Sequence, residues 1–176
     1  METMTKPVLT GLFRDRDSAE RAYQSIADRG YTSDDVNVMM SDDTRKRYFA
    51  GTPAAVETEL GNKAAEGAGI GGAIGGSLGA IAAAIAAVGT TVTLPGLGLV
   101  IAGPLAAAIA GAGAGAATGG VVGALIGWGI PEERVKEYDE AIRDGGIVMA
   151  VRPKNDEDAS YLESSWKSHR GEHVYR

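Results

Sequence analysis

Short apolar runs near both ends of the chain predict two similar β–α–β units. In the first unit, Val8–Phe13 and Val36–Met40 have the length of strands, and the residues between them have helical spacing. Asp17 offers a capping oxygen with Glu20 three residues later, which is a capping-box arrangement. Gly30 suits the end of this helix because glycine adopts a positive φ without strain. The apolar face of the predicted helix consists of Ala19, Ala22, Tyr23, Ile26 and Ala27.

The same order of elements recurs near the C-terminus. Ile147–Val151 predicts a strand, and Asp156 or Asp158 can cap the helix that follows. Gly171 ends that helix, and His173–Tyr175 predicts a last short strand. Two such units predict an α+β fold of the ferredoxin-like split βαβ kind, in which the second and third strands are normally joined directly. The apolar stripe of the second helix is formed by Ala159, Leu162 and Trp166.

In this chain the joint between the two units holds everything from Ser41 to Gly146. A short helix is predicted to begin at Asp42 or Asp43 and to run through Phe49. Another is predicted to begin at Pro131, because proline is well placed at a first helical position. The apolar stripe of that helix consists of Val135, Tyr138 and Ile142.

Between Glu66 and Glu132 the chain carries no charged residue. Its apolar and small residues predict two helices, Gly67–Val88 and Leu105–Trp128, each roughly 33–36 Å long at 1.5 Å per residue. Glycine recurs at every fourth position along both, and these helix-packing candidates are Gly67, Gly71, Gly75, Gly79, Gly111, Gly115, Gly119, Gly123 and Gly127. The predicted bend between the helices contains Pro95, Gly96, Gly98, Gly103 and Pro104.

The glycine content restricts the environment in which these helices can be stable. Each helix contains seven glycines, and over both helices the loss of helix propensity is on the order of 10 kcal/mol. A bilayer enforces the helix because an unpaired backbone is costly there, and small residues let two backbones approach closely. We therefore predict a glycine-zipper hairpin inserted in one small domain. The segments are 1–66 (first βαβ half and connecting helix), 67–130 (hairpin) and 131–176 (connecting helix and second half).

Composition and charge exclude several functions. The net charge of −6 argues against a nucleic-acid-binding surface, and the absence of cysteine excludes disulfides and thiol chemistry. Gly67-x-Gly69-x-x-Gly72 matches a dinucleotide fingerprint, but no strand precedes it and no acidic residue follows about 20 positions later. His169 and His173 have no further ligand set. We predict no catalytic residues, no cofactor, no metal and no small-molecule substrate, and therefore not an enzyme.

Several motifs resemble those of a bacterial family of general-stress, heat-induced or low-temperature-induced proteins. They are the opening Val8–Met40, Lys63-Ala-Ala-Glu-Gly, Leu94-Pro-Gly-Leu-Gly with Ala102-Gly-Pro-Leu, and Gly129-Ile-Pro-Glu-Glu with Tyr138. The resemblance covers most of residues 8–151, and Leu99 departs from it where a second proline is expected. It implies a stress-linked role without catalysis.

We therefore expect a stress-associated protein that self-assembles into a homo-oligomer through the hairpin and associates with the cytoplasmic membrane. The stretch Met1–Val8 lacks the pattern of a cleaved signal peptide. All 17 Lys and Arg lie outside the hairpin, so the polar domain and both termini should be cytoplasmic if the hairpin spans a bilayer. The uncharged bend supports an alternative, a soluble homo-oligomer in the cytoplasm with hairpins packed in a shared interior. A membrane pore is a further alternative.

Overall fold

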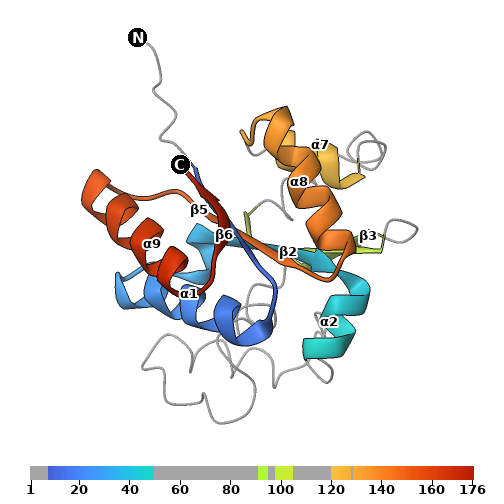
Figure 1. Ribbon diagram of the computed structural model, residues 1–176, viewed down its shortest axis with the longest axis horizontal. Coiled ribbons are helices and arrows are strands. Elements are labelled where there is room, and N and C mark those ends of the chain that lie inside the picture. Colours follow the sequence, from blue (N-terminus) through green and yellow to red (C-terminus); the bar gives the residue numbers. More distant parts are fainter. Residues whose placement is uncertain (1–7, 50–90, 95–97, 105–119, 128) are drawn as a thin grey trace.

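The computed structural model describes residues 8–49, 91–94, 98–104, 120–127 and 129–176 as an α+β fold (Figure 1). Its centre is a six-stranded antiparallel sheet with the strand order β3-β4-β2-β5-β1-β6. The strands are β1 Leu9–Phe13, β2 Val36–Ser41, β3 Thr91–Leu94, β4 Leu99–Ala102, β5 Ile147–Val151 and β6 Glu172–Tyr175. The helices are α1 Arg16–Asp28, the 3-10 turn η1 Ser33–Asp35, α2 Asp42–Phe49, α7 Gly120–Gly127, α8 Glu132–Arg143 and α9 Asp156–Ser168.

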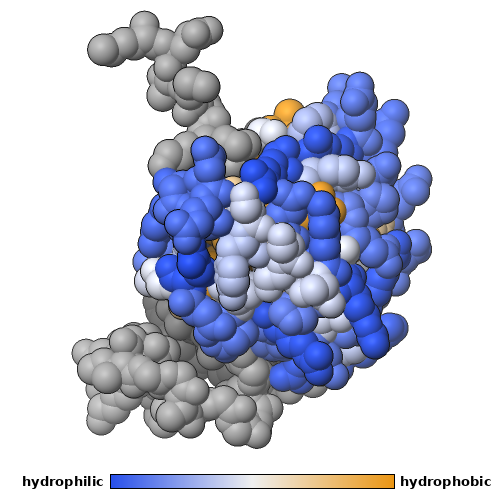
Figure 2. All heavy atoms as spheres, turned by 60° about the vertical axis from the view of Figure 1, so that its left-hand side comes forward, coloured by the Kyte–Doolittle hydropathy of each residue, from blue (hydrophilic) through white to orange (hydrophobic). Residues whose placement is uncertain are grey.

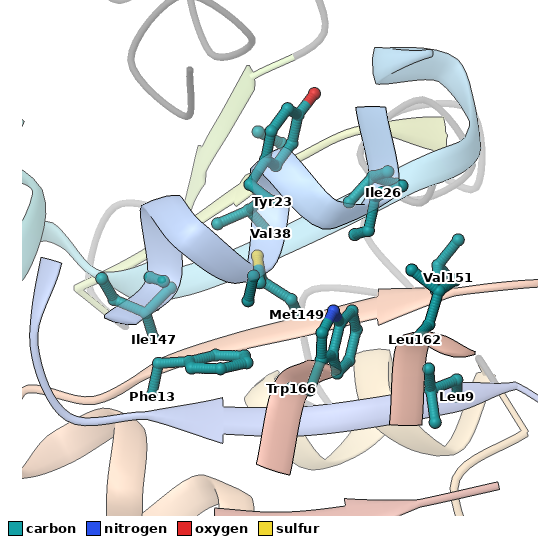
Figure 3. Packing of buried hydrophobic residues seen from close by; sticks show 14 of the residues in the cluster. Leu9, Phe13, Tyr23, Ile26, Val38, Ile147, Met149, Val151, Leu162 and Trp166 are labelled. Atoms are coloured by element: carbon teal, nitrogen blue, oxygen red, sulfur yellow. The ribbon is translucent and has the colours of Figure 1, made fainter. Parts of the chain in front are cut away.

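Helices α1 and α9 lie side by side on one face of the sheet (Figure 1). Their apolar stripes pack on the side chains that β1, β2 and β5 direct to this face. Phe13 and Trp166 meet edge to face, with ring centroids 5.6 Å apart, at the centre of this core (Figure 3). The predicted apolar stripes of both helices are thus largely confirmed, because Ala19, Ala22, Ile26, Leu162 and Trp166 are all buried.

Helix α8 covers the opposite face of the sheet, and α7 packs against α8 (Figure 1). The predicted stripe of Val135, Tyr138 and Ile142 is buried there, together with Leu125 of α7. The central strands are therefore covered on both sides, which explains why every residue of β1 and β5 is buried and why β5 is a continuous apolar run rather than an alternating pattern.

The caps of α1 and α9 lie one to three residues before the expected ones. Asp15 caps α1, since its carboxylate accepts a hydrogen bond of 2.8 Å from the backbone N–H of Ser18. Asn155 caps α9 in the same way through Asp158 N–H, at 2.7 Å. A cap residue must have extended backbone, as Asp15 does, whereas Asp17 and Asp156 lie in the first helical turn.

The expected bend between two helices is corrected by the structure. Residues 91–94 and 99–102 form β3 and β4, a β-hairpin that extends the central sheet beside β2. The sequence contains the reason, since Thr91-Val-Thr and Leu99-Val-Ile are rich in β-branched residues that favour strands. The flanking glycines and prolines mark the limits of these strands. The predicted bend residues Pro95 and Gly96 lie outside the described residues.

Candidate functional site

Helix α7 contains the described part of the glycine row. It is anchored by Leu125, whose side chain is fully buried against the α8 side of the sheet. It ends where Gly129, at φ +85°, reverses the chain and Ile130 N–H donates to the carbonyl of Leu125 at 3.2 Å. These contacts hold one side of α7 and fix the direction of its other side.

The outer side of α7 is apolar and open. Val122 and Ile126 are 39% and 47% exposed, and Gly123 lies between them in sequence. A methyl group added at Gly123 would meet no described atom within 4 Å. Tyr161 of α9 is the other large apolar side chain with comparable exposure in the described part of the chain. We define Val122, Gly123 and Ile126 as the α7 outer face.

The structure places two of the predicted packing glycines, Gly123 and Gly127, in α7. The other seven, Gly67, Gly71, Gly75, Gly79, Gly111, Gly115 and Gly119, lie outside the described residues. Sequence reasoning missed Val122 and Ile126. The signal was present, because they are four residues apart and flank the glycine row, which is the spacing of neighbours on one side of a helix.

Two of the predicted bend glycines have defined roles at the ends of β4. Gly98 has φ +61° in the turn before β4, and its carbonyl accepts a 2.7 Å hydrogen bond from Asp42 N–H. Gly103 follows β4 with φ +114°, and a Cβ there would lie 2.3 Å from the carbonyl oxygen of Val36. Both glycines therefore fit β4 to the edge of β2, while Pro104 is exposed just beyond.

The opposite face of the molecule offers a different surface. Figure 2 shows that the side on which α1 and α9 lie is mainly hydrophilic. Its polar groups are largely engaged with one another. Lys167 and Arg176 both pair with the carboxylate of Glu163 at 2.5 Å, and Arg29 pairs with Asp158. Of the exposed large apolar side chains among the described residues, Val122 and Ile126 lie on α7 and Tyr161 lies on α9.

Two buried polar networks serve as internal cross-links. Asp158 accepts hydrogen bonds from Arg29 Nε and from the Tyr31 hydroxyl, each 2.7 Å long, and these bonds hold the pKa of its carboxyl below the ordinary value of 3.8. Tyr138 donates to the His173 carbonyl at 2.6 Å and lies 2.8 Å from the Thr10 hydroxyl. Burial raises the pKa of Tyr138 to about 12. Both networks join distant elements of the fold.

A hollow of about 140 Å³ near the start of α8 contains Arg134 and Arg176 in its lining. Arg134 stacks on Tyr175, 4.1 Å from the ring centroid, and Arg176 is paired with Glu163. Within the part of the chain that the structure describes, no group of three or more His, Asp or Glu side chains could hold a metal ion.

Two further observations bear on function. Of the helices in the described ranges, none combines the length and the apolar character needed to cross a membrane. Comparison with protein-family models, with curated proteins and with solved structures finds no match to this chain.

Proposed function

We propose that this chain is a non-enzymatic, stress-associated protein that self-assembles through its glycine-striped helices and associates with the cytoplasmic membrane. The observation that carries the proposal is the α7 outer face. It displays two large apolar side chains around an open glycine, and it continues the glycine row of an uncharged stretch of the chain. A glycine between larger residues lets a second helix approach closely, and the exposed Val122 and Ile126 would lose contact with water in that contact.

The hydrophobic driving force differs between the two possible environments of this surface. In water, burial of Val122 and Ile126 against a neighbouring copy would contribute somewhat under half of the about 1.5–3 kcal/mol that a fully exposed side chain gains, because they are 39% and 47% exposed at the outset. In a bilayer the same residues would face lipid, and association would depend on close backbone packing. The α7 outer face suits both.

A soluble homo-oligomer remains the second candidate, and a specific observation favours it. The middle of the uncharged stretch, β3 and β4, lies in the same sheet as β1, β2 and β5. In this arrangement residues 91–94 and 99–102 are themselves part of the folded polar domain. Copies in this form would bury the α7 outer face against one another in water.

The remainder of the sheet supports a ferredoxin-like unit. Without β3 and β4, the strand order is β2-β5-β1-β6, and α1 and α9 connect the strands of the two β–α–β units on one face. This is the strand order of the split βαβ fold. Because proteins of many unrelated functions share that fold, the proposed function rests on the α7 outer face and not on the fold. The stress-linked role comes from the sequence resemblance described above.

The assembly proposal predicts that Gly123→Leu reduces oligomer size. The Cβ of a residue at this exposed helical position meets no described atom within 4 Å, so the melting temperature of the folded chain should not fall. The leucine would prevent close approach of a second helix. Mass from light scattering should therefore fall toward that of smaller assemblies, while circular dichroism melting stays unchanged.

The matched control is Ser164→Leu, which adds the same side chain at an exposed position of α9. This variant should keep the wild-type mass. An unchanged mass for Gly123→Leu would contradict the role of the α7 outer face. Recovery of the wild-type chain after cell lysis and an alkaline carbonate wash separates the two candidates: a membrane pellet supports the first, and a soluble oligomer supports the second.

A further inference from the structure

The β3–β4 hairpin lies in an unexpected place for a segment between two predicted membrane helices. It comes from the middle of the uncharged stretch, yet β4 pairs with β2 over four residues, from Ser41↔Leu99 to Val38↔Ala102. All four side chains of β4 are buried. The hairpin is therefore a built part of the folded domain.

This position excludes a spanning hairpin in the same molecule at the same time. If the predicted helices Gly67–Val88 and Leu105–Trp128 crossed a bilayer, residues 89–104 would lie across a hydrocarbon core about 30 Å thick. In the structure, residues 91–94 and 99–102 lie in the sheet that contains β1 and β5. A spanning hairpin would therefore require a second position for β3 and β4, one that excludes the docked position.

The sheet topology would allow the β3–β4 hairpin to leave β2 without breaking the rest of the sheet. β3 and β4 are the last two strands at one edge of the sheet, and β4 contacts the rest of the sheet only through β2. On its other side β2 pairs with β5, from Val36↔Val151 to Met39↔Val148. Removal of the hairpin would leave every pairing among β2, β5, β1 and β6 in place.

The side chains of β4 contribute to the hydrophobic cores on both faces of the sheet. Helix α7 packs on one of these faces, the one that α8 covers. Leu99 and Ile101 pack on the α8 side together with Leu125 of α7, while Val100 and Ala102 pack on the α1 side. A spanning helix Leu105–Trp128 would include α7, so Leu125 would leave with the hairpin. The docked position is therefore stabilised by burial that insertion must reverse.

We propose that the β3–β4 hairpin is a releasable latch. Docked on β2 it holds the chain in a form stable in water, and its release from β2 is required before the glycine-striped helices enter a lipid bilayer. This inference rests on the proposed membrane association and connects it to the soluble form, because the two candidates become two states of one chain.

Gly103 offers a way to weaken the latch alone. At φ +114° and with a Cβ 2.3 Å from Val36 O, an alanine here strains the docked hairpin, whereas it is a small residue like its neighbours in the released chain. Gly146 is a matched control, since a Cβ there would lie 2.7 Å from the carbonyl oxygen of Ala141, away from the hairpin. Gly146→Ala destabilises the domain without acting on the latch.

A disulfide can close the latch, because the chain has no cysteine of its own. The hydrogen bond from Asp42 N–H to Gly98 O makes the neighbouring pair Ser41↔Leu99 a non-hydrogen-bonded pair of the ladder. Cα atoms in such pairs are about 4.5 Å apart, within the range that a disulfide spans. Ser41→Cys combined with Leu99→Cys is the locking variant, and its reduced form is its own control.

The experiment measures the carbonate-resistant fraction after each full-length variant is mixed with liposomes of phosphatidylethanolamine and phosphatidylglycerol. The oxidised locking variant should not insert, and reduction should restore insertion to at least the wild-type level, because Leu99→Cys also removes apolar surface that is buried in the docked hairpin. Gly103→Ala should raise the inserted-to-soluble ratio on the order of tenfold, the factor that backbone strain of this kind contributes to an equilibrium. Gly146→Ala should leave that ratio near the wild-type value.

Each other outcome overturns the latch. Equal insertion of the oxidised and reduced locking variants would show that the hairpin need not leave β2, while membrane association would stand. If Gly103→Ala and Gly146→Ala raised the inserted-to-soluble ratio equally, general destabilisation of the domain, and not release of the hairpin, would explain insertion. Failure of the wild-type chain to insert would overturn both the latch and the membrane proposal, and would leave the soluble homo-oligomer.

Discussion

At the scale of single residues, Gly11 of β1 fits closely against the ring of Trp166 of α9. A Cβ at Gly11 would lie 2.7 Å from a ring carbon of Trp166. The indole is fully buried, and its N–H finds no hydrogen-bond acceptor among the described residues. Trp166 is therefore held by shape and burial, and the glycine is required by space rather than by a positive φ.

We expect Gly11→Ala to lower the free energy of unfolding by about 1–3 kcal/mol, the usual cost of overpacking a core. Chemical denaturation measures this. The double variant Gly11→Ala with Trp166→Phe should lose less than the sum of the two single variants, because the smaller ring makes room for the methyl group and no indole hydrogen bond is lost. Additive losses would show that the two side chains do not conflict.

At the scale of elements, helix starts depend on which residue keeps extended backbone. At α1 this residue is Asp15, because both the backbone N–H and the hydroxyl of Ser18 donate to its carboxylate. Asp17, the expected cap, lies in the first turn, where it interacts with the helix dipole only. An aspartate at either position fits the sequence pattern, and only the path of the chain out of β1 distinguishes them.

Asp15→Ala should therefore reduce the free energy of unfolding by about 1 kcal/mol, the usual value of a side-chain cap. Asp17→Ala serves as its control and should cost less, about 0.3–1 kcal/mol, through the dipole alone. Thermal and chemical unfolding of both variants compare them under identical conditions. A larger loss of stability for Asp17→Ala than for Asp15→Ala would show that Asp17 is the cap, as the sequence pattern predicts.

Helices and strands were predicted correctly where the local sequence pattern and the observed burial indicate the same type of element. β5, Ile147–Val151, has the predicted bounds, and β1, β2, α8 and α9 differ from prediction by a residue or two. The prediction was wrong for β3 and β4. There, glycine and proline were taken as signs of a loop, whereas the β-branched residues between them form β4, which pairs with β2, and β3, which pairs with β4.

At the scale of the whole molecule, a cross-link joins the two β–α–β units. Arg29 and Tyr31, at the end of α1, both donate to Asp158 at the start of α9. Lys154 strengthens the connection, since its backbone N–H donates to the Tyr31 hydroxyl at 2.7 Å and its ammonium lies 4.3 Å from the ring centroid. This network fixes the two helices relative to each other on one face.

The same network predicts a pH dependence of stability. The Tyr31 hydrogen bond and Arg29 lower the pKa of Asp158 in the folded chain, so the native state holds the charged form more tightly than the unfolded state does. Its stabilising contribution is complete above the ordinary pKa of 3.8 and is lost as the pH falls from there through the lower folded-state pKa. Unfolding curves over this acid range should show a steeper loss of stability for the wild type than for Asp158→Asn.

Asp34→Asn is the control, because Asp34 is an aspartate of η1 for which the structure shows no such network. It should keep the wild-type slope between neutral and acid pH. If the free energy of unfolding fell equally steeply with acid pH in the wild type and in Asp158→Asn, Asp158 would not contribute to the acid loss of stability.

The sequence by itself determined the two β–α–β units, the polar flanks and the uncharged, glycine-striped stretch, because each is a local pattern of burial, capping and turn residues. It did not determine which distant elements meet. Only the tertiary structure decided that α8 and α7 cover the second face of the sheet, and that β4, which carries β3 on its other side, pairs with β2 across about sixty positions of the chain, from Ser41↔Leu99 to Val38↔Ala102. Strand pairing is a long-range contact set by the exposed edge that β2 offers, and a pattern of small and apolar residues fits a helix hairpin and a sheet edge alike.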